Sequence, residues 1–319
     1  MTAGPTFAPT IAPTIAPSIM GRLSDALWRR PRLLIWLLIG PPLVWLGVFY
    51  VGSLLTMVAK AFLSIDDMSG LVTSDLTLRN IAALAEPTNR DIFLRTVLMA
   101  LAVTAASIAI AFPIAYVAVR YARGRWRALF YLGVMLPLWS SYLVKVYAWK
   151  LILAKEGIIG WAFAKLHLTW LLDAYLAVPV LGGNSLSVSY TGMFLVFVYA
   201  WLPFMILPIQ AALERVPPSV IEAAGDLGAT PGQTFRTVLW PLALPGVVAG
   251  SIFTFSLTLG DYIIPQIIGN SARFIGYAVY EYQLRANNEP LAAAVTLVPM
   301  AVLALFLWYA RRKGAFDAL

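Results

Sequence analysis

The sequence predicts an all-α polytopic membrane protein with six transmembrane helices and a helical cytoplasmic loop. Two observations indicate this class. Of the 319 residues, 61% are hydrophobic and 12% are charged, whereas a soluble domain carries about 25% charged residues. The apolar residues also gather in six long runs, and a run of about 20 apolar residues is enough for a helix to cross a bilayer.

Aromatic residues lie near several ends of these runs, as in the interfacial belts of membrane proteins. Between the runs, residues 60–92 and 150–187 are expected to form external loops with short interfacial helices. The predicted spans are 33–59, 93–119, 128–149, 188–212, 243–268 and 290–310. The aromatic residues near their ends include Trp36, Trp45, Trp139, Trp308 and Tyr309.

The lysines and arginines give these spans an orientation. Thirteen of the 23 lie in short segments on one side, and the rest are spread through longer segments on the other side. By the positive-inside rule, both termini and the loop 213–242 are therefore cytoplasmic. The net charge of +8 does not indicate nucleic-acid binding, because these residues lie beside apolar runs. The thirteen are Arg22, Arg29, Arg30, Arg32, Arg120, Arg123, Arg125, Arg127, Arg215, Arg236, Arg311, Arg312 and Lys313.

The chain divides into a membrane domain and two tails. Residues 1–30 are predicted to be a disordered, basic cytoplasmic tail, because residues 1–19 repeat Ala-Pro-Thr and lack an apolar face. Residues 31–313 form the six-helix domain, and residues 314–319 form a cytoplasmic C-terminal tail. The first span is expected to stay as an anchor, since it is too long for the core of a signal peptide and no small-residue cleavage site follows it.

The loop 213–242 is predicted to contain two short helices. Pro217-Pro218 should end the fourth span, because proline lacks a backbone donor and clashes within a helix. Ser219 stands three residues before Glu222, which is the spacing of a capping box. This first helix is expected to run from Val220 to about Leu227, with Gly228 as its left-handed stop.

The second short helix has its own start signals. Thr230 is a good cap, Pro231 suits the first helical position, and Gln233 completes another capping box. This helix is expected to end before Pro241. The first helix carries an apolar face, and its small residues allow another backbone to approach closely. That face consists of Val220, Ile221, Ala223, Ala224 and Leu227.

Two interpretations of this loop remain open on the capping pattern alone. The loop can be a docking surface for a groove on a soluble partner. It can also be an amphipathic connector that lies on the membrane surface without a partner.

The spacing of residues in this loop resembles the coupling loop, or EAA motif, of permease subunits of ABC importers. The motif is Glu-Ala-Ala, then a glycine, and then two apolar residues and a proline at fixed distances. The family more often has Ile and Leu where this chain has Val238 and Trp240, and both changes stay apolar. The resemblance covers residues 30–312. The matching positions are Glu222, Ala223, Ala224, Gly228, Val238, Trp240 and Pro241.

The resemblance implies the six-helix MetI-like fold and a place in the bacterial inner membrane, in contact with lipid. It implies that the loop inserts into a cytoplasmic ATPase, so that Glu222, Ala223, Ala224, Gly228, Val238 and Pro241 couple the chain to that subunit. The implied partners are a second permease subunit, two ATPase subunits and an external solute-binding protein. ATP and Mg²⁺ are then expected in the ATPase, with no cofactor in this chain.

Three further stretches look like the spermidine/putrescine branch of that family. They are Leu136–Tyr147, Trp201–Pro208 and Gly260–Gly269. This resemblance implies a small cationic solute, and polyamine as its class. Related permeases for opines and aminophosphonates look alike, so those solutes remain alternatives.

Asp261 and Tyr262 are candidates for the solute path. An ionisable residue within a span is costly and indicates function, and Asp261 stands four residues before Pro265, where the helix is expected to break. A carboxylate there attracts an ammonium group, and Tyr262 can add a cation–π contact. The alternative is that Asp261 caps a helix fragment or pairs with the second permease.

A second candidate for the path lies in the third span. Trp139, Ser140 and Tyr142 can line an external gate. The alternative is an interfacial belt with a snorkelling Lys145. A lysine that faced the path would repel a cationic polyamine, so the side chain of Lys145 is expected to point away from the path.

Several activities are not expected of this chain. It has no Gly-x4-Gly-Lys-Ser/Thr phosphate loop, no Gly-x-Ser-x-Gly elbow and no His-Glu-x-x-His helix. It has no Cys and a single histidine, His167, so neither a disulfide nor a Cys or His metal site is expected. A self-contained secondary transporter is disfavoured, because such proteins pair acidic residues within spans and only Asp261 is clearly placed there.

Overall fold

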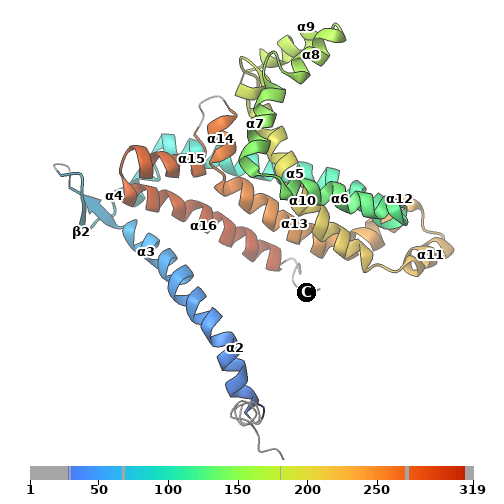
Figure 1. The fold of residues 1–319 in the computed structure, drawn as a ribbon, viewed down its shortest axis with the longest axis horizontal. Helices are drawn as coiled ribbons and strands as arrows, with labels where there is room; N and C mark the ends of the chain where they lie inside the picture. Colours follow the sequence, from blue (N-terminus) through green and yellow to red (C-terminus); the bar gives the residue numbers. More distant parts are fainter. Residues whose placement is uncertain (1–27, 29, 67–68, 180, 270–272, 313–319) are drawn as a thin grey trace, which may run out of the picture. The chain divides into compact units, whose positions relative to one another are not determined.

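A computed structural model describes residues 28, 30–66, 69–179, 181–269 and 273–312, and this part of the chain is mainly helical (Figure 1). The predicted C-terminal tail, and nearly all of the predicted N-terminal tail, lie outside these residues. The chain forms two compact units, residues 1–57 and 58–319. Among the described residues, five helices are long and apolar enough to cross a membrane, and a bent pair of helices can supply a sixth span. This agrees with the number of spans predicted.

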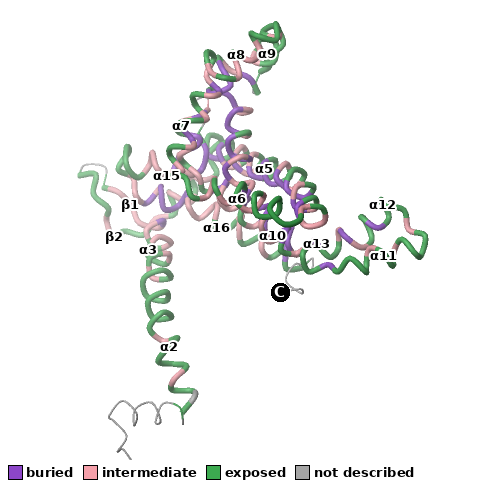
Figure 2. The backbone as a smooth tube through the Cα atoms, turned by 45° about the vertical axis from the view of Figure 1, so that its right-hand side comes forward, coloured by how far each residue is buried: buried purple, intermediate pink, exposed green. Residues whose placement is uncertain are grey.

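The first predicted span is one helix that runs to Lys60. It comprises α2 (Pro31–Trp45), a π-helical stretch (Leu46–Val51) and α3 (Gly52–Lys60). None of the residues in its most apolar window is buried, and most of its residues are exposed (Figure 2), Trp45 and Phe49 among them. An apolar helix with this exposure is suited to lipid on its outer surface.

The second unit is built on helices joined by short turns. The helices that follow α3 are α4 (Arg79–Ala83), α5 (Pro87–Arg120), α6 (Arg125–Trp139), α7 (Tyr142–Leu153), α8 (Ile158–Lys165), α9 (Thr169–Leu176), α10 (Tyr190–Glu214), α11 (Pro218–Asp226), α12 (Pro231–Thr234), α13 (Trp240–Gly260), α14 (Ile263–Ile267), α15 (Ile275–Tyr280) and α16 (Glu289–Arg312). Short 3-10 or π-helical stretches occupy Leu186–Val188, Phe235–Leu239 and Glu281–Arg285. Helices α8 and α9 are the short helices predicted for the loop 150–187.

The core of this unit is the mutual packing of α5, α10 and α13. Glycines let α13 approach α10 closely. A Cβ atom at Gly246 would lie 2.4 Å from the Pro208 carbonyl oxygen, and one at Gly250 would lie 2.7 Å from the Met205 sulfur. Small residues at helix contacts are the usual means of close packing in membranes, where the hydrophobic effect does not drive helices together.

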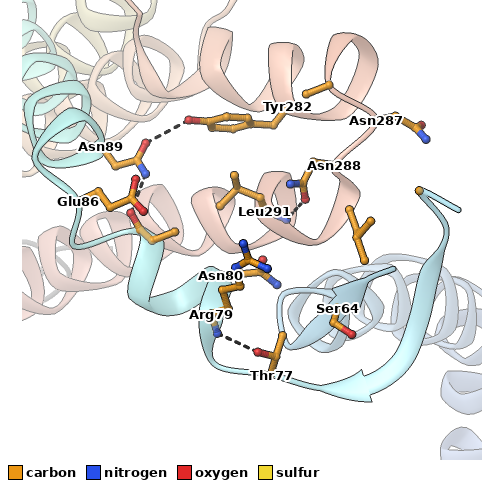
Figure 3. Close-up of a pocket in the computed structure, with 14 residues that line it drawn as sticks. Ser64, Thr77, Arg79, Asn80, Glu86, Asn89, Tyr282, Asn287, Asn288 and Leu291 are labelled. Atoms are coloured by element: carbon orange, nitrogen blue, oxygen red, sulfur yellow. Dashed lines mark hydrogen bonds between the residues drawn. The ribbon is translucent and has the colours of Figure 1, made fainter. Parts of the chain in front are cut away.

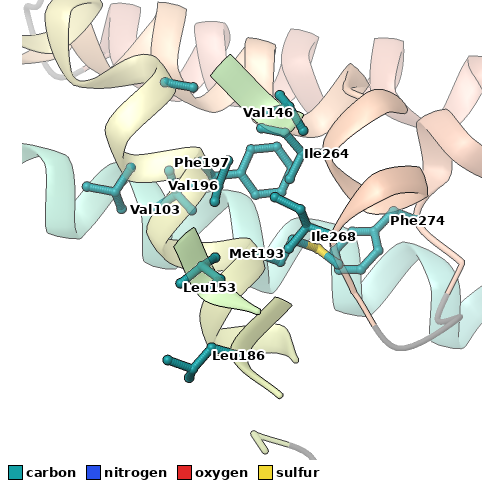
Figure 4. Close-up of a cluster of buried hydrophobic side chains, with 12 residues drawn as sticks. Val103, Val146, Leu153, Leu186, Met193, Val196, Phe197, Ile264, Ile268 and Phe274 are labelled. Atoms are coloured by element: carbon teal, nitrogen blue, oxygen red, sulfur yellow. The ribbon is translucent and has the colours of Figure 1, made fainter. Parts of the chain in front are cut away.

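Three buried apolar clusters follow the length of this core. The first joins α10 to α14 and α15 through Phe197, Ile264 and Phe274 (Figure 4). The second lies around Ile209. The third includes the stacked rings of Phe255 on α13 and Phe306 on α16, whose centroids are 4.8 Å apart.

A β-hairpin lies between α3 and α4 and was not predicted. Strands β1 (Leu63–Ile65) and β2 (Val72–Leu76) pair antiparallel. Asn80 fixes the hairpin to α4, because its side-chain amide donates to the carbonyl oxygens of Ala61 (3.1 Å) and Leu63 (2.8 Å).

The third predicted span, 128–149, is wrong as a continuous helix. Helix α6 ends at Trp139 and α7 begins at Tyr142. The direction of the chain changes by 97° between Arg125–Trp139 and Tyr142–Lys165. Pro137 lies in the last turn of α6. Its carbonyl oxygen accepts hydrogen bonds from Ser140 Oγ (3.0 Å) and Lys145 Nζ (2.7 Å), so side chains satisfy the oxygen that the break leaves without its helical partner.

The fifth predicted span, 243–268, is also interrupted. Helix α13 ends at Gly260, and Asp261 has an extended backbone with φ −72° and ψ 133°. The five-residue helix α14 then follows. A break near Asp261 was expected from the sequence. The predicted span 243–268 is nevertheless wrong as a single helix, because α13 ends at Gly260 and α14 is a separate short helix.

Candidate functional site

The first helix of the loop 213–242 begins earlier than predicted, and without its predicted cap. Helix α11 starts at Pro218, with Pro217 extended before it and no side-chain capping bond. The predicted capping box of Ser219 and Glu222 is therefore wrong. The fixed φ of Pro218 suits the first helical position, so Ser219 is already inside the helix and cannot cap it.

The end of α11 confirms the predicted left-handed stop. Gly228 has φ +81°. The Gly228 N–H donates to the Gly225 carbonyl (2.8 Å), and the Ala229 N–H donates to the Ala224 carbonyl (3.0 Å). These bonds satisfy carbonyl groups at the end of the helix, as glycine-terminated helices commonly do. A Cβ atom at Gly228 would meet nothing within 4 Å, so the backbone conformation is what favours glycine here.

The second helix starts as predicted but does not end as predicted. Both bonds of the Thr230–Gln233 capping box are present, and Pro231 is in the first turn. The helix then continues through the π-helical stretch Phe235–Leu239 into α13, so the predicted end before Pro241 is wrong. Pro241 lies in the first turn of α13, directly after the π-helical stretch, where the hydrogen-bond pattern changes and a missing N–H is tolerated.

The predicted apolar face of α11 is divided between two directions. Ile221 packs against the second cluster, whereas Leu227 is 88% exposed. Most of α11 is exposed (Figure 2). Among the predicted coupling residues, Glu222, Ala223, Gly228 and Pro241 are exposed, and Ala224 and Val238 are half-buried.

Aromatic residues fix the second half of the loop to α5. Trp240 lies against Phe112, with ring centroids 5.7 Å apart, and Phe235 lies edge-on to the same ring at 5.4 Å. Phe112 is 7% exposed. These contacts hold the helix that carries Val238 against the core, while α11 projects its exposed residues away from it.

The breaks of the third and fifth spans meet at Asp261. The Tyr142 hydroxyl, at the start of α7, donates to one carboxylate oxygen. The other oxygen accepts from the Ile264 backbone N–H at 2.9 Å. Asp261 therefore caps the fragment α14, which was one of the alternatives. The Tyr142 ring stacks on Trp201 of α10, with centroids 5.5 Å apart.

The other predicted path residues lie in different surroundings. Trp139 is 77% exposed at the end of α6, and Ser140 bonds to Pro137. Tyr262 is 40% exposed and stacks on Tyr280 with centroids 5.4 Å apart. The sequence reasoning missed Tyr280, since no local pattern relates α15 to the end of α13. A cavity of about 420 Å³ beside these rings is lined by Gly260, Tyr262, Ile275, Gly276, Val279, Tyr280, Gln283, Leu284, Thr296 and Pro299.

A polar pocket of about 420 Å³ lies between the hairpin, α4 and the start of α16 (Figure 3). Its amides mainly hold neighbouring segments together. Asn89 donates to the Ala83 carbonyl (2.7 Å) and accepts from the Tyr282 hydroxyl (3.3 Å), and Asn288 accepts from the Leu291 N–H (3.0 Å). Within the described residues, no group of three His, Cys, Asp or Glu side chains is placed to hold a metal ion.

Residues 81–312 match the family of binding-protein-dependent transport system inner membrane components. The chain belongs to this family. It is 55% identical over 300 residues to the inner membrane ABC transporter permease protein YdcU of Escherichia coli strain K12, covering 94% of this chain and 96% of the relative. It is 27% identical over 272 residues to the spermidine/putrescine transport system permease protein PotB of the same strain, covering 84% and 94%.

The fold agrees with this membership. The chain is similar to a chain of the crystal structure of a bacterial ABC transporter involved in the import of alginate. The TM-score is 0.64, with 16% sequence identity, and the likeness covers 92% of this chain and 98% of that one. The protein is thus an integral inner-membrane permease subunit of an ABC importer, with the MetI-like fold, and its relatives are transport subunits, not enzymes.

Proposed function

We propose that this permease forms, with a second permease subunit, the membrane path for a small cationic solute, with polyamines such as spermidine and putrescine as its class. The likeness to PotB supports this class. The name of YdcU specifies no solute. In this proposal an external solute-binding protein delivers the solute, and two cytoplasmic ATPase subunits drive its passage.

The observation that carries the proposal is the Asp261 carboxylate at the junction of the two broken spans. A carboxylate in a partly buried position binds an ammonium group more strongly than it does in water, because the local dielectric is lower. Tyr262 follows Asp261 in the chain, and its ring stacks on Tyr280 at the wall of the cavity of about 420 Å³. These two rings can contribute cation–π attraction. Lys145 Nζ is bonded to the Pro137 carbonyl, so that cation already has a partner.

Coupling is proposed to take place through residues 219–240, on the cytoplasmic side. The exposed residues Glu222, Ala223, Leu227 and Gly228 supply a small, projecting surface that suits a cleft on the ATPase. The half-buried Ala224 and Val238 and the exposed Pro241 complete the proposed coupling set. Docking transmits work only if its free energy differs between two states of the permease, so the ATPase cycle has to change the position of α11.

Uptake of labelled spermidine and putrescine in cells with and without this chain tests the proposed solute. The expected result is a saturable uptake that disappears on deletion and returns on complementation. An opine and an aminophosphonate serve as unlabelled competitors. Uptake of polyamine that persists without the chain, or that an aminophosphonate competes away more strongly than spermidine does, contradicts the polyamine assignment.

A further inference from the structure

Glu214 collects three side-chain donors at the point where α10 ends and the loop begins. Its Oε1 accepts hydrogen bonds from Arg127 Nη2 (2.6 Å), from the Tyr131 hydroxyl and from Gln210 Nε2 (3.2 Å). Arg127 and Tyr131 are one turn apart on α6, so they present their polar groups on the same side of that helix. We call these four residues the Glu214 cluster.

A second contact holds the chain two residues further on. Arg120, the last residue of α5, donates from Nη2 to the Val216 carbonyl at 3.0 Å. Val216 is 5% exposed and belongs to the second apolar cluster. Residues 121–124 make the turn between α5 and α6, with Gly124 at φ +55°. Arginines on both sides of this turn therefore hold Glu214, the last residue of α10, and Val216, which lies in the short segment between α10 and the start of α11 at Pro218.

Helix α6 touches the apolar core through few side chains. Val134 is its one buried residue, and Phe130 packs against the second apolar cluster. The polar contacts to Glu214 add a defined orientation of α6 relative to the end of α10. At its other end α6 stops at the break before Tyr142, whose hydroxyl bonds Asp261. Helix α6 has 15 residues, which is a length of about 22 Å at 1.5 Å per residue.

We propose that Arg127, Tyr131 and Glu214 are positioning residues that make α6 move together with the coupling loop. A displacement of α11 then reaches the break between α6 and α7, and with it the Tyr142–Asp261 contact. The proposal rests on the proposed coupling through residues 219–240. The loop is already connected to the path directly, because it continues into α13. The new element is a second connection, from the loop through α6 to the break at Tyr142.

The Arg127–Glu214 ion pair is too exposed to contribute much to the stability of the fold, so a positioning role can be tested separately from folding. The side chains of Arg127 and Glu214 are 46% and 33% exposed, and ion pairs with such exposure contribute little to stability. Their loss should leave insertion and assembly intact. Three donors on one oxygen still define an orientation, so removing any one of them loosens α6 relative to the loop.

The test uses the complete transporter, with its partner subunits and binding protein, in proteoliposomes. The measured quantity is solute imported per ATP hydrolysed. Glu214→Gln and Arg127→Gln are each expected to lower this ratio about fivefold, the lower end of typical coupling between sites. The double variant should be no worse than either single variant, because both remove the same interaction. Arg127→Lys, which keeps the charge, should retain most of the ratio.

A matched control lies elsewhere in the chain. Lys60 and Glu289 form an ion pair of the same length, 2.6 Å, with side chains 44% and 41% exposed. Lys60→Gln is expected to leave the ratio unchanged, which shows that loss of an exposed ion pair is not sufficient for the effect.

Gly228→Glu changes the loop itself. It therefore distinguishes failure of the proposed role of α6 from failure of the proposed coupling through residues 219–240. If Gly228→Glu lowers the ratio and both variants at Glu214 and Arg127 leave it unchanged, the role of α6 is refuted and coupling through the loop stands. If none of the three variants changes the ratio, the proposed coupling fails as well. Losses that add in the double variant also contradict the proposal, since they show two independent effects.

Discussion

Replacing Asp261 by Asn removes one negative charge from the junction of the broken spans and keeps the local shape. The Asn side-chain oxygen can still accept from the Ile264 N–H, which the Asp261 carboxylate does now at 2.9 Å. The fold should therefore survive. A hydrogen bond to a charged group is worth about 1.5–3 kcal/mol. Since 1.4 kcal/mol is tenfold in an equilibrium constant, the concentration of spermidine for half-maximal uptake should rise about ten- to a hundredfold.

Tyr142→Phe is the matched control for this prediction. It removes the hydroxyl that donates to Asp261, keeps the ring that stacks on Trp201 and leaves the carboxylate charged. Attraction for an ammonium group should therefore persist or increase. The assay is spermidine uptake against concentration in proteoliposomes that contain equal amounts of each transporter. If the Asp261→Asn transporter reaches half-maximal uptake at the same spermidine concentration as the wild type, the Asp261 carboxylate does not bind the solute.

Three further substitutions, one of them with a control substitution, test the loop and the packing. Gly228→Ala puts a side chain on a residue with φ +81°, which costs about 1–2 kcal/mol. Because this strain disturbs the loop, the amount of solute imported per ATP hydrolysed should fall. An unchanged amount argues against a role for this loop conformation in coupling. Gly246→Val places a side chain 2.4 Å from the Pro208 carbonyl, so overpacking of about 1–3 kcal/mol should lower the unfolding temperature in detergent. Gly225→Ala is the control, because the space around Gly225 is open, and it should leave the unfolding temperature unchanged. Equal unfolding temperatures for the two variants contradict the close approach of α13 to α10. Thr230→Ala removes the helix cap, worth about 1 kcal/mol, so amide hydrogen exchange at residues 232–235 should quicken, and exchange at the wild-type rate is the contrary result.

Features that depend on neighbours in sequence were predictable here. The apolar runs gave helices because a span needs only length and hydrophobicity. The cap at Thr230 and the stop at Gly228 follow from residues within four positions of each other. The same reasoning misplaced the start of α11, because Pro217-Pro218 and Ser219 offered competing starts and the fixed φ of proline prevailed.

Features that depend on distant contacts were not predictable from local pattern. The break between α6 and α7 lies at Ser140-Ser141, inside a segment that is apolar enough overall to be taken for one span, and Lys145 bonds back to the Pro137 carbonyl across the break. Tyr142 and Asp261 are 119 positions apart, and the donors on α6 are more than 80 positions from Glu214. A pattern of hydrophobicity carries no information about these pairings.

The hairpin β1–β2 was missed for a similar reason. Its strands are three and five residues long, which is too short for a clear alternation of apolar and polar residues. Asn80, which fixes the hairpin through two carbonyl groups, belongs to the following helix α4.

We propose that this permease couples ATP hydrolysis to import of a cationic solute through the loop 219–240. The most direct test is ATP-dependent accumulation of labelled spermidine in proteoliposomes with the complete transporter, comparing the wild type with Glu222→Lys. We expect saturable accumulation by the wild type, and we expect the Glu222→Lys transporter to assemble normally but to accumulate little spermidine. Equal accumulation by both transporters, or none by the wild type in the presence of its binding protein, contradicts the account.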